Sequence, residues 1–195
     1  MAKAGQGGLE SLTASLPPEN RGLPPIERWN PPFCGDIDMR IASDGTWFYQ
    51  KTPIGRMPLV KLFASVLKRE GDKYFLVTPV EKVGIVVDDV PFLAVEMKTS
   101  SGENGQVLQF RTNVDDWVAA GPANALRFER QPANAGLKPY LHVRRDLLAK
   151  VTRALFYDLV ALGEEREVSG KIMFGVLSGG EFFAMAEASA LREFA

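Results

Sequence analysis

The chain has 195 residues, of which 46% are hydrophobic and 24% are charged, and its formal net charge is −1. These values are typical of a globular protein of one domain or two small ones, and a chain without net positive charge is not expected to bind a nucleic acid polymer. No apolar run reaches the roughly 18 residues of a membrane span. The N-terminus lacks the apolar core of a signal peptide, so we expect a cytoplasmic protein without a membrane partner.

The chain contains a single cysteine, Cys34, and a single histidine, His142. One cysteine excludes an intramolecular disulfide, which agrees with a reducing compartment. Zinc sites usually draw on several cysteine and histidine ligands, and no nucleophile-elbow sequence accompanies His142. We therefore expect no cofactor and no metal, and catalysis is the less favoured reading.

Residues 1–23 are rich in glycine, serine and proline and show little hydrophobic periodicity. Pro-Pro pairs favour extended polyproline-like backbone, so this segment is predicted to be a flexible arm. A proline-rich ligand for a partner domain is the alternative reading of the same segment.

A β-hairpin is predicted from Asp36–Ala42 and Thr46–Lys51, which flank the turn signal Asp44-Gly45. A two-residue loop and a four-residue loop both place Ile37, Met39, Ile41 and Phe48 on one face. The opposite face then holds the charged residues and two of the aromatic ones: Asp36, Asp38, Arg40, Trp47, Tyr49 and Lys51. A three-residue loop would reverse the faces of one strand and overturn this assignment.

A helix is predicted to begin at Pro58, where a missing N–H costs nothing, and to end at Gly71. Its apolar stripe, with a spacing of 3.6 residues, ends at Leu67. The segments Lys73–Thr78 and Lys82–Val87 follow as predicted strands.

The second half of the chain is richer in predicted strands and contains one long predicted helix, Asp146–Leu162. The strands form two hairpins and two single segments: Phe92–Thr99 with Gln106–Thr112, Lys171–Leu177 with Glu181–Ala186, Ala125–Glu129, and Tyr140–Arg144. Strands followed by a helix suit a bent sheet or barrel capped by that helix, as in pleckstrin-homology-like folds. Because the element order is similar in both halves, duplication of one motif is a further interpretation. We predict an α+β protein with an N-terminal hairpin-helix subdomain, residues 24–90, and a C-terminal subdomain, residues 91–195, both built of antiparallel strands and a helix.

The strings CGDIDM and DGTWFY, followed by TPI and an arginine, resemble a bacterial family called domain of unknown function 1285, most densely from Pro24 to Met97. In that family a small residue is usual at the position of Lys51. The resemblance implies two related subdomains, the second of them pleckstrin-homology-like. It also implies a ligand site in the cleft between them, with nucleotide-based ligands and a role in signalling or stress response as the suggested context. It carries over no functional residues.

The candidate site therefore comes from the residues themselves. An aromatic ring can stack on a base, an arginine can bind phosphate through two nitrogens, and a carboxylate can accept hydrogen bonds from ribose hydroxyls. The predicted ligand-binding residues are Asp36, Asp38, Arg40, Trp47, Tyr49, Arg56, Lys82 and Arg144. Cross-strand pairing of these side chains, or their burial against the other half, is the structural alternative.

The leading hypothesis is a non-enzymatic protein that binds a small molecule, with nucleotide-based ligands as the favoured class, between the two subdomains. The alternative is a protein-interaction module that uses the proline-rich arm or the hairpin aromatics, so a protein partner is left open. The third hypothesis is a metal-dependent hydrolase that uses the acid pair Asp36 and Asp38.

Overall fold

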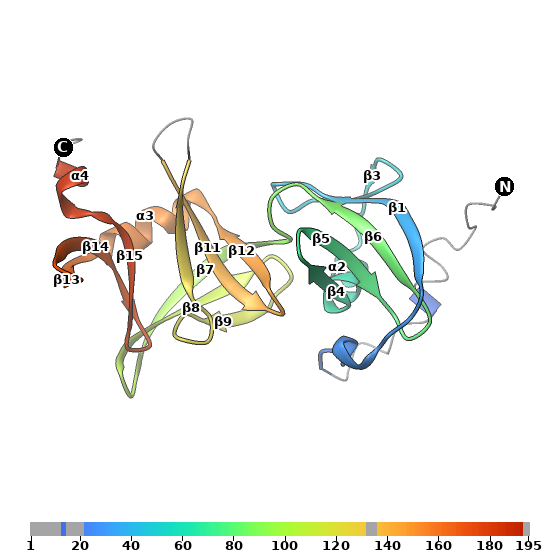
Figure 1. The fold of residues 1–195 in the computed structure, drawn as a ribbon, viewed down its shortest axis with the longest axis horizontal. Coiled ribbons are helices and arrows are strands. Elements are labelled where there is room, and N and C mark those ends of the chain that lie inside the picture. Colours follow the sequence, from blue (N-terminus) through green and yellow to red (C-terminus); the bar gives the residue numbers. More distant parts are fainter. Residues whose placement is uncertain (1–12, 15–21, 132–135, 193–195) are drawn as a thin grey trace. The chain divides into compact units, whose positions relative to one another are not determined.

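Each half of the chain forms its own unit around a six-stranded sheet (Figure 1). The computed structural model describes residues 13–14, 22–131 and 136–192. The chain divides between Asp89 and Val90 into two compact units, which we call unit 1 and unit 2. Most of the predicted arm, residues 1–23, lies outside the described residues. Within the described part, no helix has the length and apolar character needed to cross a membrane.

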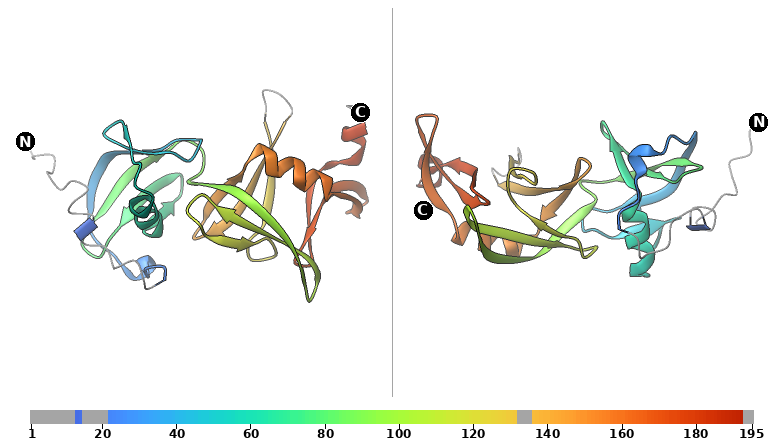
Figure 2. Two further views of the ribbon diagram at one scale, coloured as in Figure 1. Left: turned by 180° about the vertical axis from the view of Figure 1, so that it is seen from behind. Right: turned by 90° about the horizontal axis from the view of Figure 1, so that it is seen from below.

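From residue 22 onward, the described part of unit 1 is built of six strands, one α-helix and a short 3₁₀ helix. Its elements are η1 (Ile26–Arg28), β1 (Phe33–Ile41), β2 (Trp47–Tyr49), β3 (Thr52–Pro53), α2 (Met57–Ser65), β4 (Leu67–Glu70), β5 (Lys73–Val77) and β6 (Lys82–Val87). The strands form one sheet, here called sheet A, in the order β3-β2-β1-β6-β5-β4. Helix α2 lies against one face of sheet A (Figure 2), and the face away from α2 is here called the open face.

Unit 2 contains a second six-stranded sheet and a three-stranded one. Its elements are β7 (Phe92–Gly102), β8 (Gly105–Thr112), β9 (Trp117–Ala119), β10 (Leu126–Arg130), β11 (Leu137–Arg144), β12 (Leu147–Val151), α3 (Arg153–Ala161), β13 (Glu164–Val168), β14 (Lys171–Ser178), β15 (Glu181–Glu187) and α4 (Ala188–Arg192). Sheet B has the order β10-β11-β12-β7-β8-β9, and sheet C has the order β13-β14-β15.

Sheets A and B repeat one topology. Each consists of two three-stranded antiparallel meanders, joined where the first strand of the sheet pairs in parallel with the last: β1 with β6, and β7 with β12. The helix position differs, because α2 connects the two meanders in unit 1 whereas α3 follows the last strand in unit 2. The predicted α+β fold of two related subdomains is thus confirmed. The expectation of purely antiparallel strands is wrong at the two junctions, where the pairs are parallel. The sequence carries no local signal for these pairs, because no short turn connects the first strand of a sheet with its last.

The register of the first hairpin differs from those that a two-residue or a four-residue loop would give. Met39 pairs with Tyr49 and Ile41 with Trp47, and the Ala42 N–H donates to the Thr46 carbonyl. The loop therefore has three residues and ends on a glycine with φ of 81°, while the Asp44 carboxylate accepts the Thr46 N–H. This odd loop length reverses the faces of β2, so the predicted faces of this hairpin are wrong.

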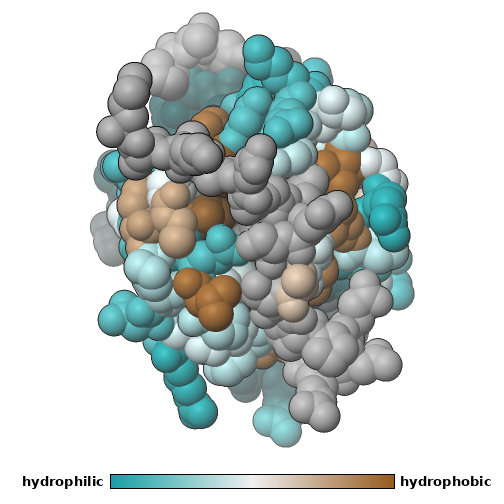
Figure 3. Space-filling model, turned by 90° about the vertical axis from the view of Figure 1, so that its right-hand side faces the viewer, coloured by the Kyte–Doolittle hydropathy of each residue, from teal (hydrophilic) through white to brown (hydrophobic). Residues whose placement is uncertain are grey.

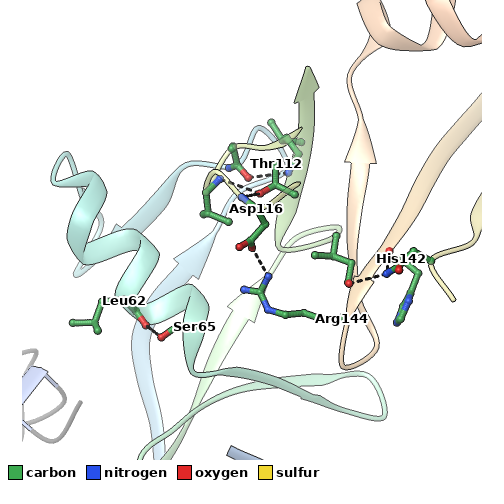
Figure 4. A network of polar contacts seen from close by, with 11 residues as sticks. Leu62, Ser65, Thr112, Asp116, His142 and Arg144 are labelled. Atoms are coloured by element: carbon green, nitrogen blue, oxygen red, sulfur yellow. Dashed lines mark hydrogen bonds and ion pairs between the residues drawn. The ribbon is translucent and has the colours of Figure 1, made fainter. Parts of the chain in front are cut away.

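Helix α2 begins one residue before the predicted start and ends well before Gly71. The Ser65 hydroxyl donates to the Leu62 carbonyl at 2.7 Å in the last turn (Figure 4). The following residues form β4, which pairs with β5 and buries Leu67, so sheet pairing outweighs continuation of the helix. Gly71, with φ of 60°, belongs to the tight turn between β4 and β5.

The predicted helix Asp146–Leu162 is wrong over its first third, which is strand β12. Arg145 and Asp146 have φ values of 50° and 59° and form a two-residue turn between β11 and β12. Leu147 and Val151 are buried at a two-residue period that a helical stripe also allows. Pairing of β12 on both sides, with β11 and β7, settles the conformation as a strand.

Sheet C is anchored to sheet B through Ser178, which is fully buried. Its hydroxyl donates to the Ala120 carbonyl at 2.7 Å and accepts the Leu108 N–H at 2.8 Å. A buried hydroxyl that makes both bonds satisfies two backbone groups which would otherwise be unpaired. The tail of the chain is therefore an integral part of unit 2.

Candidate functional site

The open face of sheet A carries part of the predicted site. Asp36, Asp38 and Arg40 are exposed along β1, and the neighbouring strand β6 contributes Lys82. The structure thus brings these four predicted residues onto one face of sheet A. Figure 3 shows one side of the molecule, where hydrophobic patches lie among hydrophilic side chains.

The predicted aromatic members are not on that face. Trp47 is only 1% exposed and stacks on Phe63 of α2, with ring centroids 6.3 Å apart. Tyr49 pairs with Met39 and is half-buried. The three-residue loop is the physical cause, because it turns both aromatics away from the face of Arg40. Trp47 therefore cannot stack on a ligand, and the protein-interaction alternative also loses this aromatic residue as a contact.

Two of the three predicted cations of unit 1, Arg40 and Lys82, have acidic partners. Arg40 forms a two-pronged ion pair with Asp88, in which Nε donates to Oδ1 at 2.8 Å. This hydrogen bond raises the pKa of Arg40 and lowers that of Asp88. Lys82 donates to Glu70 at 2.9 Å, and its Nζ lies 4.7 Å from the centroid of the Phe75 ring. The charges of Arg40 and Lys82 are therefore paired with acidic side chains of unit 1 itself.

The two remaining predicted cations differ in their surroundings. Arg56 is the N-cap residue of α2, where its backbone carbonyl accepts the Val60 N–H, while its side chain is exposed and makes no capping bond. Arg144 belongs to unit 2, where it forms an ion pair with Asp116 (Figure 4). Its guanidinium carbon lies 5.0 Å from the centroid of the Phe92 ring. Only 12% of the Arg144 side chain is exposed, so it packs like a core residue.

A different pocket in unit 2 gathers positive charge. It has a volume of about 410 Å³, lies where β11, β12 and α3 meet, and is here called the α3 pocket. This volume falls within the range of small-molecule sites. Three of its lining residues are basic and none is acidic: the full set is Gln131, Gly136, Leu137, Lys138, Pro139, Lys150, Val151, Arg153, Phe156 and Tyr157.

The first turn of α3 forms one wall of the α3 pocket. Thr152 is the N-cap residue and makes no side-chain capping bond. The first N–H groups of a helix lack acceptors within the helix, and with the helix dipole they favour an anion at this end. Arg153 adds a full positive charge in the same turn.

An exposed aromatic ring lies beside this positive charge. Arg153 Nε donates to the Tyr157 hydroxyl at 3.0 Å, and its guanidinium carbon is 5.7 Å from the ring centroid. Tyr157 is 57% exposed. Phe156 packs on Phe128 with ring centroids 6.3 Å apart, which fixes the helix against β10. The α3 pocket therefore combines an anion-binding turn with a ring available for stacking.

Two lysines on adjacent strands add to the charge. Lys150 on β12 pairs with Tyr140 on β11, and Lys138 lies two residues before Tyr140. Residues two apart on a strand share a face, so Lys138 and Lys150 are diagonal neighbours on one face of sheet B. Together with Arg153, they can neutralise an anion with more than one negative charge.

The sequence reasoning missed the α3 pocket because it assigned wrong elements there. No strand is predicted between Glu129 and Tyr140, so Lys138 lies outside the predicted elements, and the predicted helix from Asp146 onward places Lys150 on a helix. The sequence does contain a signal for this pocket. Lys138 and Lys150 lie near the two ends of the segment that forms the β11–β12 hairpin, and Arg153 follows Thr152 at the start of α3.

A metal-dependent reaction has no assembled ligand set in the part of the chain that the structure describes. Within that part, no group of three or more histidine, cysteine, aspartate or glutamate side chains is placed to hold a metal ion. Asp36 and Asp38 lie on one strand, and among the described residues they belong to no such group.

The fold and site define an α+β protein with a duplicated sheet topology and a basic pocket in its second unit. The sequence matches the N-terminal domain of DUF1285, described as a domain of unknown function, over residues 24–90, and the C-terminal domain of the same family over residues 91–185. The chain therefore belongs to the DUF1285 family.

Two crystal structures of family members are similar to this chain. A DUF1285 family protein from Silicibacter pomeroyi DSS-3 is 48% identical, with a TM-score of 0.85 over 95% of this chain and 98% of that one. A DUF1285 family protein from Shewanella baltica OS155 is 29% identical, with a TM-score of 0.51 over 64% of this chain and 91% of that one. Among curated proteins the comparison found no match.

Proposed function

We propose that this protein is a non-enzymatic binding protein of the bacterial cytoplasm whose ligand is a small anion bearing a planar ring, of the nucleotide class. The observation that carries the proposal is the α3 pocket, where three basic side chains and the N-terminus of α3 surround a volume of about 410 Å³ without an acidic lining residue. A nucleotide supplies both features that the pocket can recognise, a phosphate and a ring. In this proposal the bound nucleotide controls a response in signalling or stress.

Each part of the pocket has a role in this proposal. Arg153, Lys138 and Lys150 bind the phosphate through charge-assisted hydrogen bonds together with the first N–H groups of α3. Tyr157 stacks on the ring, an interaction that tolerates different bases. The hydrogen bond from Arg153 to the Tyr157 hydroxyl holds the two side chains in a fixed relation.

The test is thermal denaturation and calorimetric titration of the full chain with AMP, ADP, adenosine and inorganic phosphate. A ligand at about 100 times its dissociation constant stabilises the protein by about 2.7 kcal/mol. We expect nucleotides to stabilise most, and Arg153→Gln and Tyr157→Leu each to weaken binding at least about tenfold.

Arg127→Gln is the matched control, because Arg127 is an exposed arginine of unit 2 outside the pocket. Nucleotide binding that survives both pocket substitutions, or that Arg127→Gln reduces equally, contradicts the assignment to the α3 pocket. Absence of stabilisation by every member of the panel contradicts the proposed ligand class.

A further inference from the structure

A second pocket lies in unit 1, on sheet A, and is here called the Gly84 pocket. Its volume is about 290 Å³, and its lining residues are Asp36, Ile37, Asp72, Lys73, Tyr74, Phe75, Gly84, Ile85, Val86 and Val87. In contrast to the α3 pocket, it presents charges of both signs, and polar and apolar atoms contribute about equally to its lining. Any ligand it binds must therefore differ in chemistry from a nucleotide.

Gly84 lines the pocket between Asp36 and Phe75. Gly84 of the central strand β6 pairs with Asp36 of β1 on one side and with Phe75 of β5 on the other. These three positions share the open face of sheet A, and because Gly84 has no side chain, the Asp36 carboxylate can lie over β6. Val86, two residues along β6 on the same face, is 57% exposed and adds apolar surface to the pocket.

The carboxylate of Asp36 lies directly over Gly84. A Cβ atom on Gly84 would lie only 1.9 Å from Asp36 Oδ1 and 3.1 Å from its Cγ. The side chain of Asp36 thus occupies space that any other residue at position 84 would need. Among the described residues, the Asp36 side chain has no hydrogen-bond or ion-pair partner, although Arg40 and Lys82 on the same face are both paired with acids.

A positive charge lines the far side of the pocket. Lys73 precedes Tyr74, whose partner on β6 is Ile85, so Lys73 lies beside Val86. Its ammonium group also has no acidic partner in the described part of the chain. β1 and β5 flank β6, so their backbones are about 10 Å apart, and Asp36 and Lys73 form no ion pair with each other.

Three charged residues line the pocket, and one of them, Asp72, lies 3.7 Å from the guanidinium group of Arg69. The other two, Asp36 and Lys73, carry opposite charges and do not pair with each other, so they are complementary to a ligand that carries both charges itself. We propose that the Gly84 pocket binds a zwitterionic ligand of the amino-acid class with an apolar side chain. Asp36 accepts hydrogen bonds from the ligand ammonium group, Lys73 donates to its carboxylate, and Phe75 and Val86 contact the side chain. This site belongs to unit 1 and is independent of the α3 pocket, so either can fail without the other.

The test is an NMR titration of the ¹⁵N-labelled full chain with L-leucine and two analogues that each lack one charge. 3-Methylbutylamine lacks the carboxylate, and 4-methylpentanoate lacks the ammonium group. We expect saturable shifts of the Gly84 and Val86 amide signals with leucine, and binding of each analogue weaker by about tenfold or more, as for a lost hydrogen bond to a charged group. Leu-Leu, titrated in parallel, shows whether a wider charge separation fits better.

Variants assign the two charges. Asp36→Asn is expected to abolish the preference for leucine over 4-methylpentanoate, and Lys73→Gln the preference over 3-methylbutylamine. Asp38→Asn is the control, since Asp38 is exposed on the same strand but does not line the pocket. The proposal is overturned if either analogue binds as tightly as the zwitterions, or if no saturable shift occurs up to roughly 10 mM, ten times the dissociation constant of a weak 1 mM complex.

Discussion

Asp36 and Gly84 share one volume of space: the carboxylate of the first occupies the place where a side chain on the second would begin. In a strand, glycine is less stable than alanine by roughly 0.5–1 kcal/mol. We therefore expect Gly84→Ala to stabilise unit 1 by that amount only when Asp36 is also replaced by alanine. In the wild-type background the gain is cancelled, because the Asp36 side chain has to move. A double-mutant cycle by urea denaturation measures this coupling, and the same cycle with Asp38→Ala should show additive effects.

Trp47 offers a test of an unsatisfied group in the core. Its indole N–H is buried and has no hydrogen-bond partner among the described residues, while its ring stacks on Phe63. Trp47→Phe removes the donor but keeps an aromatic ring, so we expect a change in the free energy of unfolding of less than about 1 kcal/mol. Trp47→Ala should cost about 3–5 kcal/mol. Equal losses in the two variants, measured by chemical denaturation, would show that the N–H has a partner after all.

Lys51 occupies a turn position that disfavours its side chain. Its φ is 64°, and the left-handed region costs a residue with a Cβ about 1–2 kcal/mol. Replacement by glycine removes this strain, but glycine loses more conformational entropy on folding, which offsets part of the gain. Lys51→Gly is therefore expected to stabilise the protein by up to about 1 kcal/mol. Lys61→Gly is the control, because Lys61 lies inside α2 and should lose roughly 0.5–1 kcal/mol. Two changes of the same sign would contradict the turn assignment.

Glu70 makes the stability of unit 1 depend on pH. The hydrogen bonds that it accepts from Lys82 and then Lys68 lower the pKa of this carboxyl below its usual value. Since the pKa is lower in the folded state, the contribution is complete above the unfolded pKa, near 4.5, and is lost as the pH falls through the folded value. The carboxyl is partly exposed, so we expect Glu70→Gln to cost less than about 1 kcal/mol at pH 7 and to flatten the pH dependence below 4.5. Denaturation at both pH values tests this, and Glu103→Gln in an exposed turn should change neither.

Ser178 is expected to be the most sensitive serine of unit 2. Ser178→Ala leaves the Leu108 N–H without its acceptor inside the protein, which should cost roughly 1–3 kcal/mol. Ser100→Ala is the control, because that hydroxyl is exposed and its bond to the Val107 carbonyl is 3.4 Å long. It should change stability by less than about 0.5 kcal/mol. Similar values for the two variants, from thermal denaturation, would mean that sheet C docks without this hydroxyl.

Local signals in the sequence predicted most strands and the fold class, but not where strands end and helices begin. β5 and β6 have strong β-branched and aromatic composition, and they form within a residue of the predicted bounds. β4 and β12 were assigned to helices, because their apolar residues fit a helical stripe as well as a two-residue period. Only hydrogen bonds to β5 in one case, and to β7 and β11 in the other, decide between the two conformations.

The predicted site depended on a single loop length, which the sequence does not determine. Asp44-Gly45 predicts a turn, but the glycine follows a type I turn in a three-residue loop, so Trp47 faces the core. Asp36 and Arg40 were placed correctly on the exposed face because they lie before the turn. The α3 pocket depends on pairing between β11 and β12 and on where α3 starts, which are tertiary features that periodicity alone cannot supply.

The parallel junction of first and last strands has a consequence for biosynthesis. Sheet A cannot be completed until Val87 has been translated and has left the ribosome, and sheet B has to wait for Val151. Pairings of such high contact order form slowly, so each nascent unit exposes the edges of two unjoined meanders for a time. A chain that stops before the last strand of either unit would keep those edges, and would be a substrate for chaperones and proteases.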